Sequence, residues 1–284
     1  MRTRHLTTAL AALALAAIAA ACVGEQRWPK VVPEVAGDSA QPFTFAVMGD
    51  NRGDPVPNVY LEILKQINAS DAKFAINTGD IVPGDADVAK TSAQLDRFLA
   101  ATAPLGPPMY VTYGNHEQRS PAHLEMLERR IGPRYFAFTC GNSRFYLLNT
   151  EIVGGQIIGE QLRWLTADLA GEGQRAAHRF VFLHRPLFSP LNDTGKRAWG
   201  DAANLSLLQG LFVEHRVDMV FSGHDHYFSW RVVEGVTHVT TGGGGAPLYL
   251  GPGALSINHY LLVRVNGEQV LLDFRPILPP PAAP

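Results

Sequence analysis

The chain has 284 residues, 46% hydrophobic and 18% charged, and its 24 Lys and Arg against 26 Asp and Glu give a formal net charge of −2. This composition excludes an intrinsically disordered chain, lacks the basic excess typical of nucleic-acid-binding proteins, and contains too few cysteines for a disulfide scaffold. It is the composition of a globular protein with a sizeable core.

The first 21 residues have the pattern of a secretory signal peptide. Arg2 and Arg4 give a charged start, Leu6 to Ala21 is almost wholly apolar, and three alanines precede Cys22. The apolar run is shorter than the roughly 18–20 residues of a membrane-spanning helix. Cys22 also resembles the acylated cysteine of a bacterial lipoprotein, and the alternative is ordinary cleavage with an incidental cysteine. We expect an exported protein, periplasmic or extracellular, whose contact with the membrane is a lipid on Cys22.

The remaining chain divides into a tether, one domain and a tail. Residues 22–41 mix proline, glycine and charge without periodicity, as linkers do. Residues 276–284 contain five prolines in nine positions, which is typical of an extended end. We therefore predict a single domain over residues 42–275.

Strands and helices alternate in the first half of this domain at roughly 30-residue spacing, the pattern of βαβ units with parallel strands. The expected strands are Phe43–Met48, Phe74–Asn77 and Met109–Tyr113, and the expected helices are Val56–Ala69, Ala86–Ala101 and Ala122–Ile131.

The second half is richer in strands and ends in a hairpin across Asn266-Gly267, a frequent two-residue turn. Its expected helices are Glu160–Ala170 and Asp201–His215. Its expected strands are Tyr135–Thr139, Phe145–Asn149, Arg179–His184, Asp218–Ser222, Tyr227–Val233, Thr237–Thr241, Tyr260–Val265 and Gln269–Phe274. The chain as a whole is predicted to be of the α/β class.

Polar side chains with metal-binding chemistry stand at the carboxyl ends of these strands, where ligands bind in open α/β sheets. They are Asp50, Asp80, Asn115, His116, His184, His224 and His226. Carboxylate, amide and imidazole groups together suit Mn, Fe, Zn or a similar divalent ion. Because the set is too large for one tetrahedral zinc, two ions sharing a carboxylate are the economical arrangement.

In sequence order these segments resemble the motifs of the calcineurin-like metallophosphoesterases, from about Phe43 to Phe274. The motifs are Gly49-Asp50, Gly79-Asp80, Gly114-Asn115-His116-Glu117, His184 and Gly223-His224-Asp225-His226. The resemblance implies a four-layer αββα sandwich of two mixed β-sheets flanked by helices, with the site between the C-terminal edges of the sheets.

The resemblance also implies a role for each residue. The site would hold one or two divalent ions. Asp80 would bridge the two, and His116 would act on the substrate as general acid or transition-state stabiliser. The other ligands would be Asp50 and His226 for the first ion, and Asn115, His184 and His224 for the second. A metal-bound hydroxide would attack phosphorus in line, on a small phosphorylated substrate that is a phosphomonoester or a phosphodiester.

One position departs from the family pattern. Arg52 stands where the first motif, Asp-x-His, has a histidine ligand, and a guanidinium has no lone pair for a metal. Three roles are open to Arg52. In the first, it swings away and leaves a weaker first metal site that water or the Asn51 amide completes. In the second, it binds a phosphate oxygen of the substrate, and in the third its charge replaces the first ion. The second role makes Arg52 a candidate catalytic residue beside His116.

Three other segments have weaker signals. Glu117 is either a partner that orients a ligand or an acid at a helix start, and Asp225 is expected to point away from the ions. Gly242–Gly245 is expected to pass close to the metal centre, and Ser189–Trp199 is either a substrate lid or a solvated loop.

We expect a phosphoester hydrolase. The alternatives are a degenerate, non-catalytic member that binds a phosphorylated ligand and a binuclear hydrolase of amides or lactones. The sequence does not predict an oligomeric state.

Overall fold

A computed structural model of the chain describes residues 41–54, 56–193, 199–251 and 253–278. The expected signal peptide, Cys22 and residues 22–40 of the tether lie outside these described residues. Residues 279–284 of the expected tail and residues 194–198 of the loop Ser189–Trp199 also lie outside them. Among the helices that are described, none has the length and hydrophobicity needed to cross a membrane.

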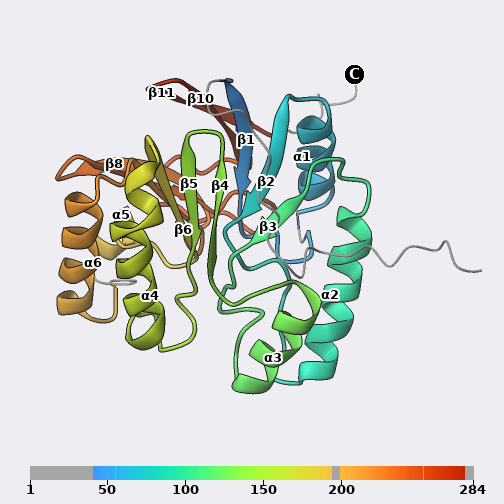
Figure 1. Cartoon of the computed structure of the whole chain (residues 1–284). Helices are drawn as coiled ribbons and strands as arrows, with labels where there is room; N and C mark the ends of the chain where they lie inside the picture. The colour runs from blue at the N-terminus through green and yellow to red at the C-terminus, as the bar shows by residue number, and fades with distance from the viewer. Residues whose placement is uncertain (1–40, 55, 194–198, 252, 279–284) are drawn as a thin grey trace, which may run out of the picture.

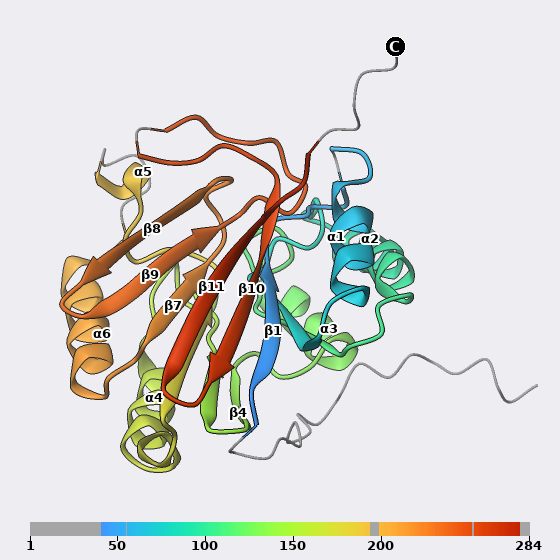
Figure 2. The ribbon, with the colours of Figure 1, turned by 90° about the horizontal axis from the view of Figure 1, so that it is seen from above.

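The described residues form two β-sheets that pack face to face (Figures 1 and 2). The strands are β1 (Phe43–Met48), β2 (Ala72–Asn77), β3 (Met109–Val111), β4 (Phe136–Cys140), β5 (Ser143–Leu147), β6 (His178–Leu183), β7 (Met219–Ser222), β8 (Phe228–Val233), β9 (Val236–Thr241), β10 (His259–Asn266) and β11 (Gln269–Pro276). The first sheet has the order β11-β10-β1-β2-β3, and the second has the order β4-β5-β6-β7-β9-β8.

Helices cover the outer face of each sheet, which completes the predicted αββα sandwich (Figure 1). The helices are α1 (Val59–Asn68), α2 (Val88–Thr102) and α3 (Pro121–Arg130) on the first sheet, and α4 (Gly159–Ala170) and α6 (Ala202–Glu214) on the second; the chain also forms the short α5 (Pro190–Asp193) and a 3₁₀ turn at Glu172–Arg175. Asp87, Ser120 and Asp201 cap the first turns of α2, α3 and α6 by accepting backbone N–H groups.

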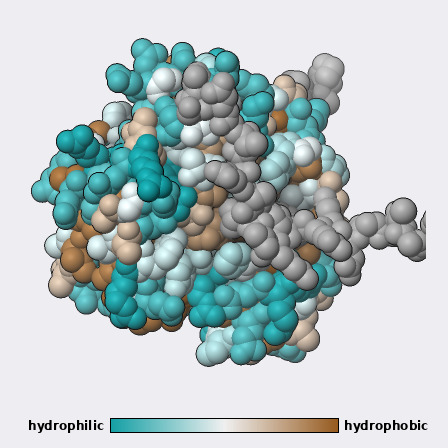
Figure 3. Space-filling model, in the orientation of Figure 1, coloured by the Kyte–Doolittle hydropathy of each residue, from teal (hydrophilic) through white to brown (hydrophobic). Residues whose placement is uncertain are grey.

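Helix α6 is apolar on its outer side as well as on its buried side. Leu208 and Phe212 pack against the second sheet, whereas Leu207 and Val213 are exposed. In the same orientation, the space-filling view has a hydrophobic area at the left, where Figure 1 places α6 (Figure 3).

Aromatic side chains fill the space between the two sheets. Phe45 of β1 stacks on Phe74 of β2 with ring centroids 5.5 Å apart, and it meets the edges of Phe145 at 5.1 Å and Phe180 at 5.2 Å in the opposite sheet. All four rings are fully buried. This close-packed interior fixes the strand ends of one sheet relative to those of the other.

Parallel pairing brings the carboxyl ends of several strands to one edge of each sheet. Strands β1, β2 and β3 are parallel neighbours in the first sheet, and β5, β6, β7 and β9 are parallel neighbours in the second. The loops that follow β1, β2, β3, β6 and β7 carry the polar residues singled out in the sequence.

The C-terminal hairpin forms as the sequence predicts. Although it follows the strand-rich second half of the chain, β10 pairs antiparallel with β1 in the first sheet, where Phe43 lies opposite Val265. Leu261, Val263 and Val265 all enter the core between the sheets. The hairpin therefore places β1 in the interior of the first sheet (Figure 2).

Candidate metal centre

The structure brings the predicted residues together where the two sheets' strand ends meet. Asp50 and Asp80 follow β1 and β2, and His184 directly follows β6. Two groups of three residues have ligand atoms within 4.8 Å of one another, and Asp80 belongs to both. The groups are Asp80, His184 and His224, and Asp50, Asp80 and His226.

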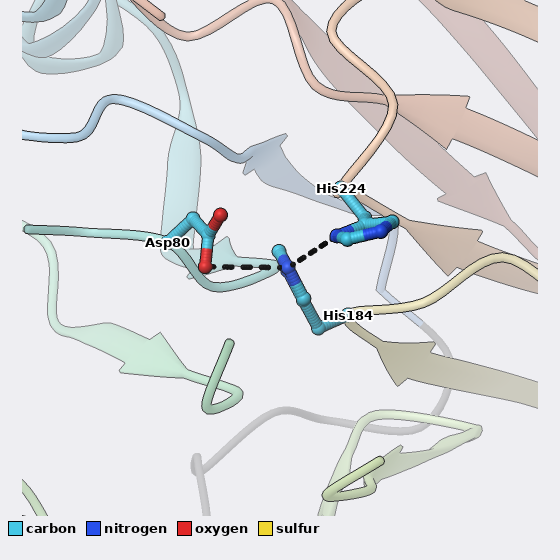
Figure 4. A group of neighbouring side chains, drawn as sticks. All are labelled: Asp80, His184 and His224. Atoms are coloured by element: carbon cyan, nitrogen blue, oxygen red, sulfur yellow. Dashed lines mark hydrogen bonds and ion pairs between the residues drawn. The ribbon is translucent and has the colours of Figure 1, made fainter. Parts of the chain in front are cut away.

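In the first group, lone-pair atoms surround Nε2 of the buried His184 (Figure 4). This nitrogen lies 3.3 Å from Asp80 Oδ1 and 3.2 Å from His224 Nδ1. Asn115 Oδ1 lies 3.1 Å from the same nitrogen. Four atoms that can each donate an electron pair to a cation therefore converge from four different loops.

Hydrogen bonding fixes which nitrogen of His184 faces this cluster. Its Nδ1 lies 2.9 Å from the carbonyl oxygen of Thr78, which only accepts, so Nδ1 carries a proton and the neutral ring presents the Nε2 lone pair. Burial opposes a charge on His184, but the carboxylates of Asp80 and Asp50 outweigh it and raise its pKa. Positive charge is thus favoured at this point, and the donor set fits a divalent ion.

The second group is built in the same way around His226. Its Nδ1 donates to the carbonyl oxygen of Pro247 at 2.7 Å, and its Nε2 lies 3.5 Å from Asp50 Oδ1. Asp50 is fully buried and also accepts the backbone N–H of His224 at 2.9 and 3.0 Å. Two carboxylates and one imidazole, with its tautomer set by a backbone carbonyl, again fit a divalent ion.

The backbone at the site is unusual. Asp50, Asp80 and His224 have φ values of 62°, 54° and 66°, in the left-handed region that residues other than glycine uncommonly adopt. At Gly114 and Gly223 a Cβ atom would collide with the carboxylates of Asp80 and Asp50. The left-handed backbone and the glycines without a Cβ atom let the ligand side chains lie close together. Strained backbone of this kind is common at functional sites.

Glu117 connects two of the ligand-bearing loops. One carboxyl oxygen accepts the backbone N–H of Asp80 at 3.0 Å and that of Gly114 at 2.9 Å. The residue is fully buried and lies before α3 begins at Pro121, so it is not a helix-start acid. Burial, with a contribution from nearby Asp80, raises its pKa. Glu117 therefore orients the loops that carry Asp80 and Asn115.

His116 lies against Asp80 at the edge of the cluster. Its backbone N–H donates to Asp80 Oδ1 at 2.9 Å, its Nδ1 donates to the carbonyl oxygen of Pro83 at 2.5 Å, and its Nε2 lies 3.6 Å from Asp80 Oδ2. The Arg52 guanidinium is 3.3 Å from Nδ1 of the same ring. Burial, aided by Arg52 and Arg119, lowers the pKa of His116 against the opposing effect of Asp80.

Several weaker sequence signals have structural counterparts. Asp225 is buried and accepts hydroxyl hydrogen bonds from Ser189 at 2.6 Å and Tyr227 at 2.9 Å. A Cβ on Gly242 would lie 3.0 Å from Asp50 Oδ2, so this glycine segment does pass the centre. The Asn51 amide bonds to Ile81 and Asn77, which joins the loops after β1 and β2.

Sequence reasoning missed three residues at the site. Arg185 forms a two-bonded ion pair with Glu151 at 2.8 and 2.9 Å, and its Nη1 lies 3.4 Å from His224 Nε2. Glu151 follows β5 at the same sheet edge, so the strand-end rule that identified the others applies to it. Tyr249 stacks on His226 with ring centroids 4.2 Å apart. It lies in a long loop, where no local pattern indicates a contact.

The chain is similar in sequence to known proteins. The sequence model of the family described as calcineurin-like phosphoesterase matches residues 43–228. The serine/threonine-protein phosphatase CPPED1 of Bos taurus is 32% identical over 171 residues, which cover 54% of this chain and 53% of that protein. Purple acid phosphatase 22 of Arabidopsis thaliana is 28% identical over 239 residues, which cover 73% of this chain and 51% of that protein.

Among solved structures, purple acid phosphatase PPD1 from yellow lupin (Lupinus luteus) seeds has a similar fold. Its TM-score is 0.70 at 18% sequence identity, and the match covers 86% of this chain and 52% of that one. The chain thus spans about half the length of the relatives described here.

Proposed function

Since the chain belongs to the calcineurin-like phosphoesterase family, we propose that it is a metal-dependent hydrolase of phosphoesters. The observation that carries this proposal is the pair of ligand groups that share the buried carboxylate of Asp80. The similarity to two phosphatases supports it. The proposed substrate is a small phosphorylated molecule, either a phosphomonoester or a phosphodiester.

In this proposal the two groups hold one or two divalent ions, with Mn, Fe or Zn suited to the donor set. Asp80 belongs to both shells. Asp50 and His226 complete the first, and Asn115, His184 and His224 complete the second. Bound divalent ions supply two effects: they lower the pKa of the attacking water and neutralise charge on the phosphoryl oxygens.

His116 is the proposed general acid. Because Nδ1 is engaged by Pro83, the proton available for the leaving group is the one on Nε2 of the doubly protonated ring. That nitrogen is 3.6 Å from Asp80 Oδ2, so it faces the shared carboxylate. Burial lowers the pKa of His116 on balance, so the ring gains this proton at a lower pH than a free histidine does; the Asp80 carboxylate opposes the lowering. Proton donation from Nε2 then assists departure of the alkoxide.

Arg52 is proposed to bind a phosphate oxygen of the substrate. Its guanidinium lies beside His116, the residue proposed to act on the leaving group, and such a group forms paired hydrogen bonds to phosphate. An Arg52→His variant tests this role against a weakened first site. Tighter metal binding in the variant would indicate a weakened site, whereas unchanged metal binding with a raised KM supports substrate binding.

The proposal is tested by hydrolysis of p-nitrophenyl phosphate and bis(p-nitrophenyl) phosphate with added Mn²⁺, before and after chelation. Turnover that chelation abolishes and Mn²⁺ restores supports the hydrolase, and the ratio of the two rates separates monoesterase from diesterase. Absence of turnover with Mn²⁺, Fe²⁺ and Zn²⁺ would contradict it and favour a non-catalytic protein that binds a phosphorylated ligand.

We also propose that the protein is exported and held at a membrane through a lipid on Cys22. The charged start, apolar run and small residues before Cys22 support this.

A further inference from the structure

The segment Pro247–Tyr249 holds His226 through three contacts. The carbonyl oxygen of Pro247 accepts from Nδ1 at 2.7 Å, and the backbone N–H of Tyr249 donates to the carbonyl oxygen of His226 at 2.9 Å. The Tyr249 ring stacks on the imidazole at 4.2 Å with an angle of 18° between the planes. One short segment therefore fixes the backbone, the tautomer and the ring plane of one residue.

The orientation of His226 matters more here than that of a ligand in a complete shell. Its group contains two carboxylates and a single imidazole, because Arg52 has no lone pair to give. Rotation about the bond between Cβ and the ring is broad and soft in a free histidine. A rotated ring would turn Nε2 away from Asp50, which lies 3.5 Å from it.

Tyr249 also separates His226 from solvent. His226 is almost completely buried, whereas the tyrosine stacked on it is partly exposed. The phenol ring thus opposes rotation of the imidazole and shields the site from water on that side. The hydrogen bond from Nδ1 to Pro247 also opposes rotation of the imidazole, but it does not cover the ring.

We propose that Tyr249 is a positioning residue that controls occupancy of the metal site formed by Asp50, Asp80 and His226. This inference rests on the proposed function, because it takes His226 to be a metal ligand. It assigns Tyr249 no contact with the ion. The ring acts through the imidazole, and the site containing His184 and His224 is independent of it.

The test is a calorimetric titration of the metal-free protein with Mn²⁺, comparing the wild type with Tyr249→Leu and Tyr249→Phe. The leucine variant keeps the backbone bond to His226 and removes the aromatic plane. We expect it to bind one of two Mn²⁺ ions about ten- to a hundredfold more weakly, as outer-shell substitutions do, with the other ion unaffected. Tyr249→Phe keeps the ring and is expected to restore both affinities.

Leu250→Ala is the matched control, because Leu250 is 89% exposed on the same segment. It is expected to bind both ions as the wild type does. If Tyr249→Leu bound both Mn²⁺ ions as tightly as the wild type, the inference about Tyr249 would be overturned while the proposed function would stand. The same would follow if Tyr249→Phe bound Mn²⁺ as weakly as Tyr249→Leu. A wild-type protein that binds no Mn²⁺ would instead refute the proposed function, and the inference with it.

Discussion

Asp80→Asn is expected to remove most of the stabilisation that metal ions give the protein. Asp80 is the carboxylate common to both ligand groups, and it is 1% exposed. Asparagine has nearly the same shape, and its carbonyl oxygen can still accept the backbone N–H of His116. The substitution therefore removes a negative charge from both sites while it preserves the local hydrogen bonding.

The magnitude follows from ligand linkage. At a Mn²⁺ concentration of about 100 Kd, the binding of one ion stabilises the wild type by about 2.7 kcal/mol. If the substitution weakens binding about a hundredfold, the same concentration stabilises the variant by about 0.4 kcal/mol. At about 2–4 °C per kcal/mol for a domain of this size, Mn²⁺ should raise Tm by about 5–10 °C in the wild type and by about 1 °C in the variant.

Thermal unfolding followed by circular dichroism, with and without Mn²⁺, measures this difference. Asp225→Asn is the matched control, because Asp225 is a buried aspartate between two candidate ligands whose carboxylate is bound by Ser189 and Tyr227. Its metal-induced rise in Tm should equal that of the wild type, whatever its Tm without metal. A rise in Asp80→Asn as large as in the wild type would show that the shared carboxylate is not a metal ligand.

Three further predictions follow. His116→Ala should lower turnover by about a hundredfold or more and leave Mn²⁺ affinity unchanged, with a larger loss for an alkyl than for a nitrophenyl ester; equal losses would argue against proton donation. Burial lowers the pKa of His259 to about 4, so the unfolded chain takes up a proton near pH 6.5 that the folded protein does not bind. The free energy of unfolding should therefore fall between pH 6.5 and 4, by up to about 3 kcal/mol from this residue, and urea unfolding of His259→Gln should show a shallower fall. Cys22→Ser should move the protein from the membrane fraction to the soluble fraction of cells, and a wild-type protein already soluble would contradict the lipid anchor.

Periodicity in the sequence predicts most elements of the fold but not all of their partners. The first strand is expected at Phe43–Met48 and found there, because a continuous apolar run is typical of a strand buried on both faces. The hairpin formed by β10 and β11 is also found, but the sequence pattern does not indicate which sheet it joins. An alternating pattern indicates which side chains face inward. Which strand lies next to it depends on how the rest of the chain packs around the core.

The candidate site is predictable to the extent that its residues follow strands. Asp50, Asp80 and His184 all obey this rule, and the structure brings them together. The position of the Arg52 side chain beside His116 depends on a backbone φ of 42°, which no sequence pattern indicates. Tyr249 reaches His226 from a loop whose path is set by tertiary contacts, so only the structure reveals it.

Pairing between β1 and β10 has a consequence for the order of folding. Strand β1 carries Asp50 at its end, and one of its two neighbours, β10, lies more than 200 residues away in the sequence, with Phe43 opposite Val265. Such distant contacts are slow to form because a long loop must close first. A chain released before residue 266 would leave one edge of β1 unpaired and its apolar face open to aggregation. We expect the metal centre to be assembled only after β10 has been synthesised, so that synthesis of the ligand-bearing loops and acquisition of metal are separate events.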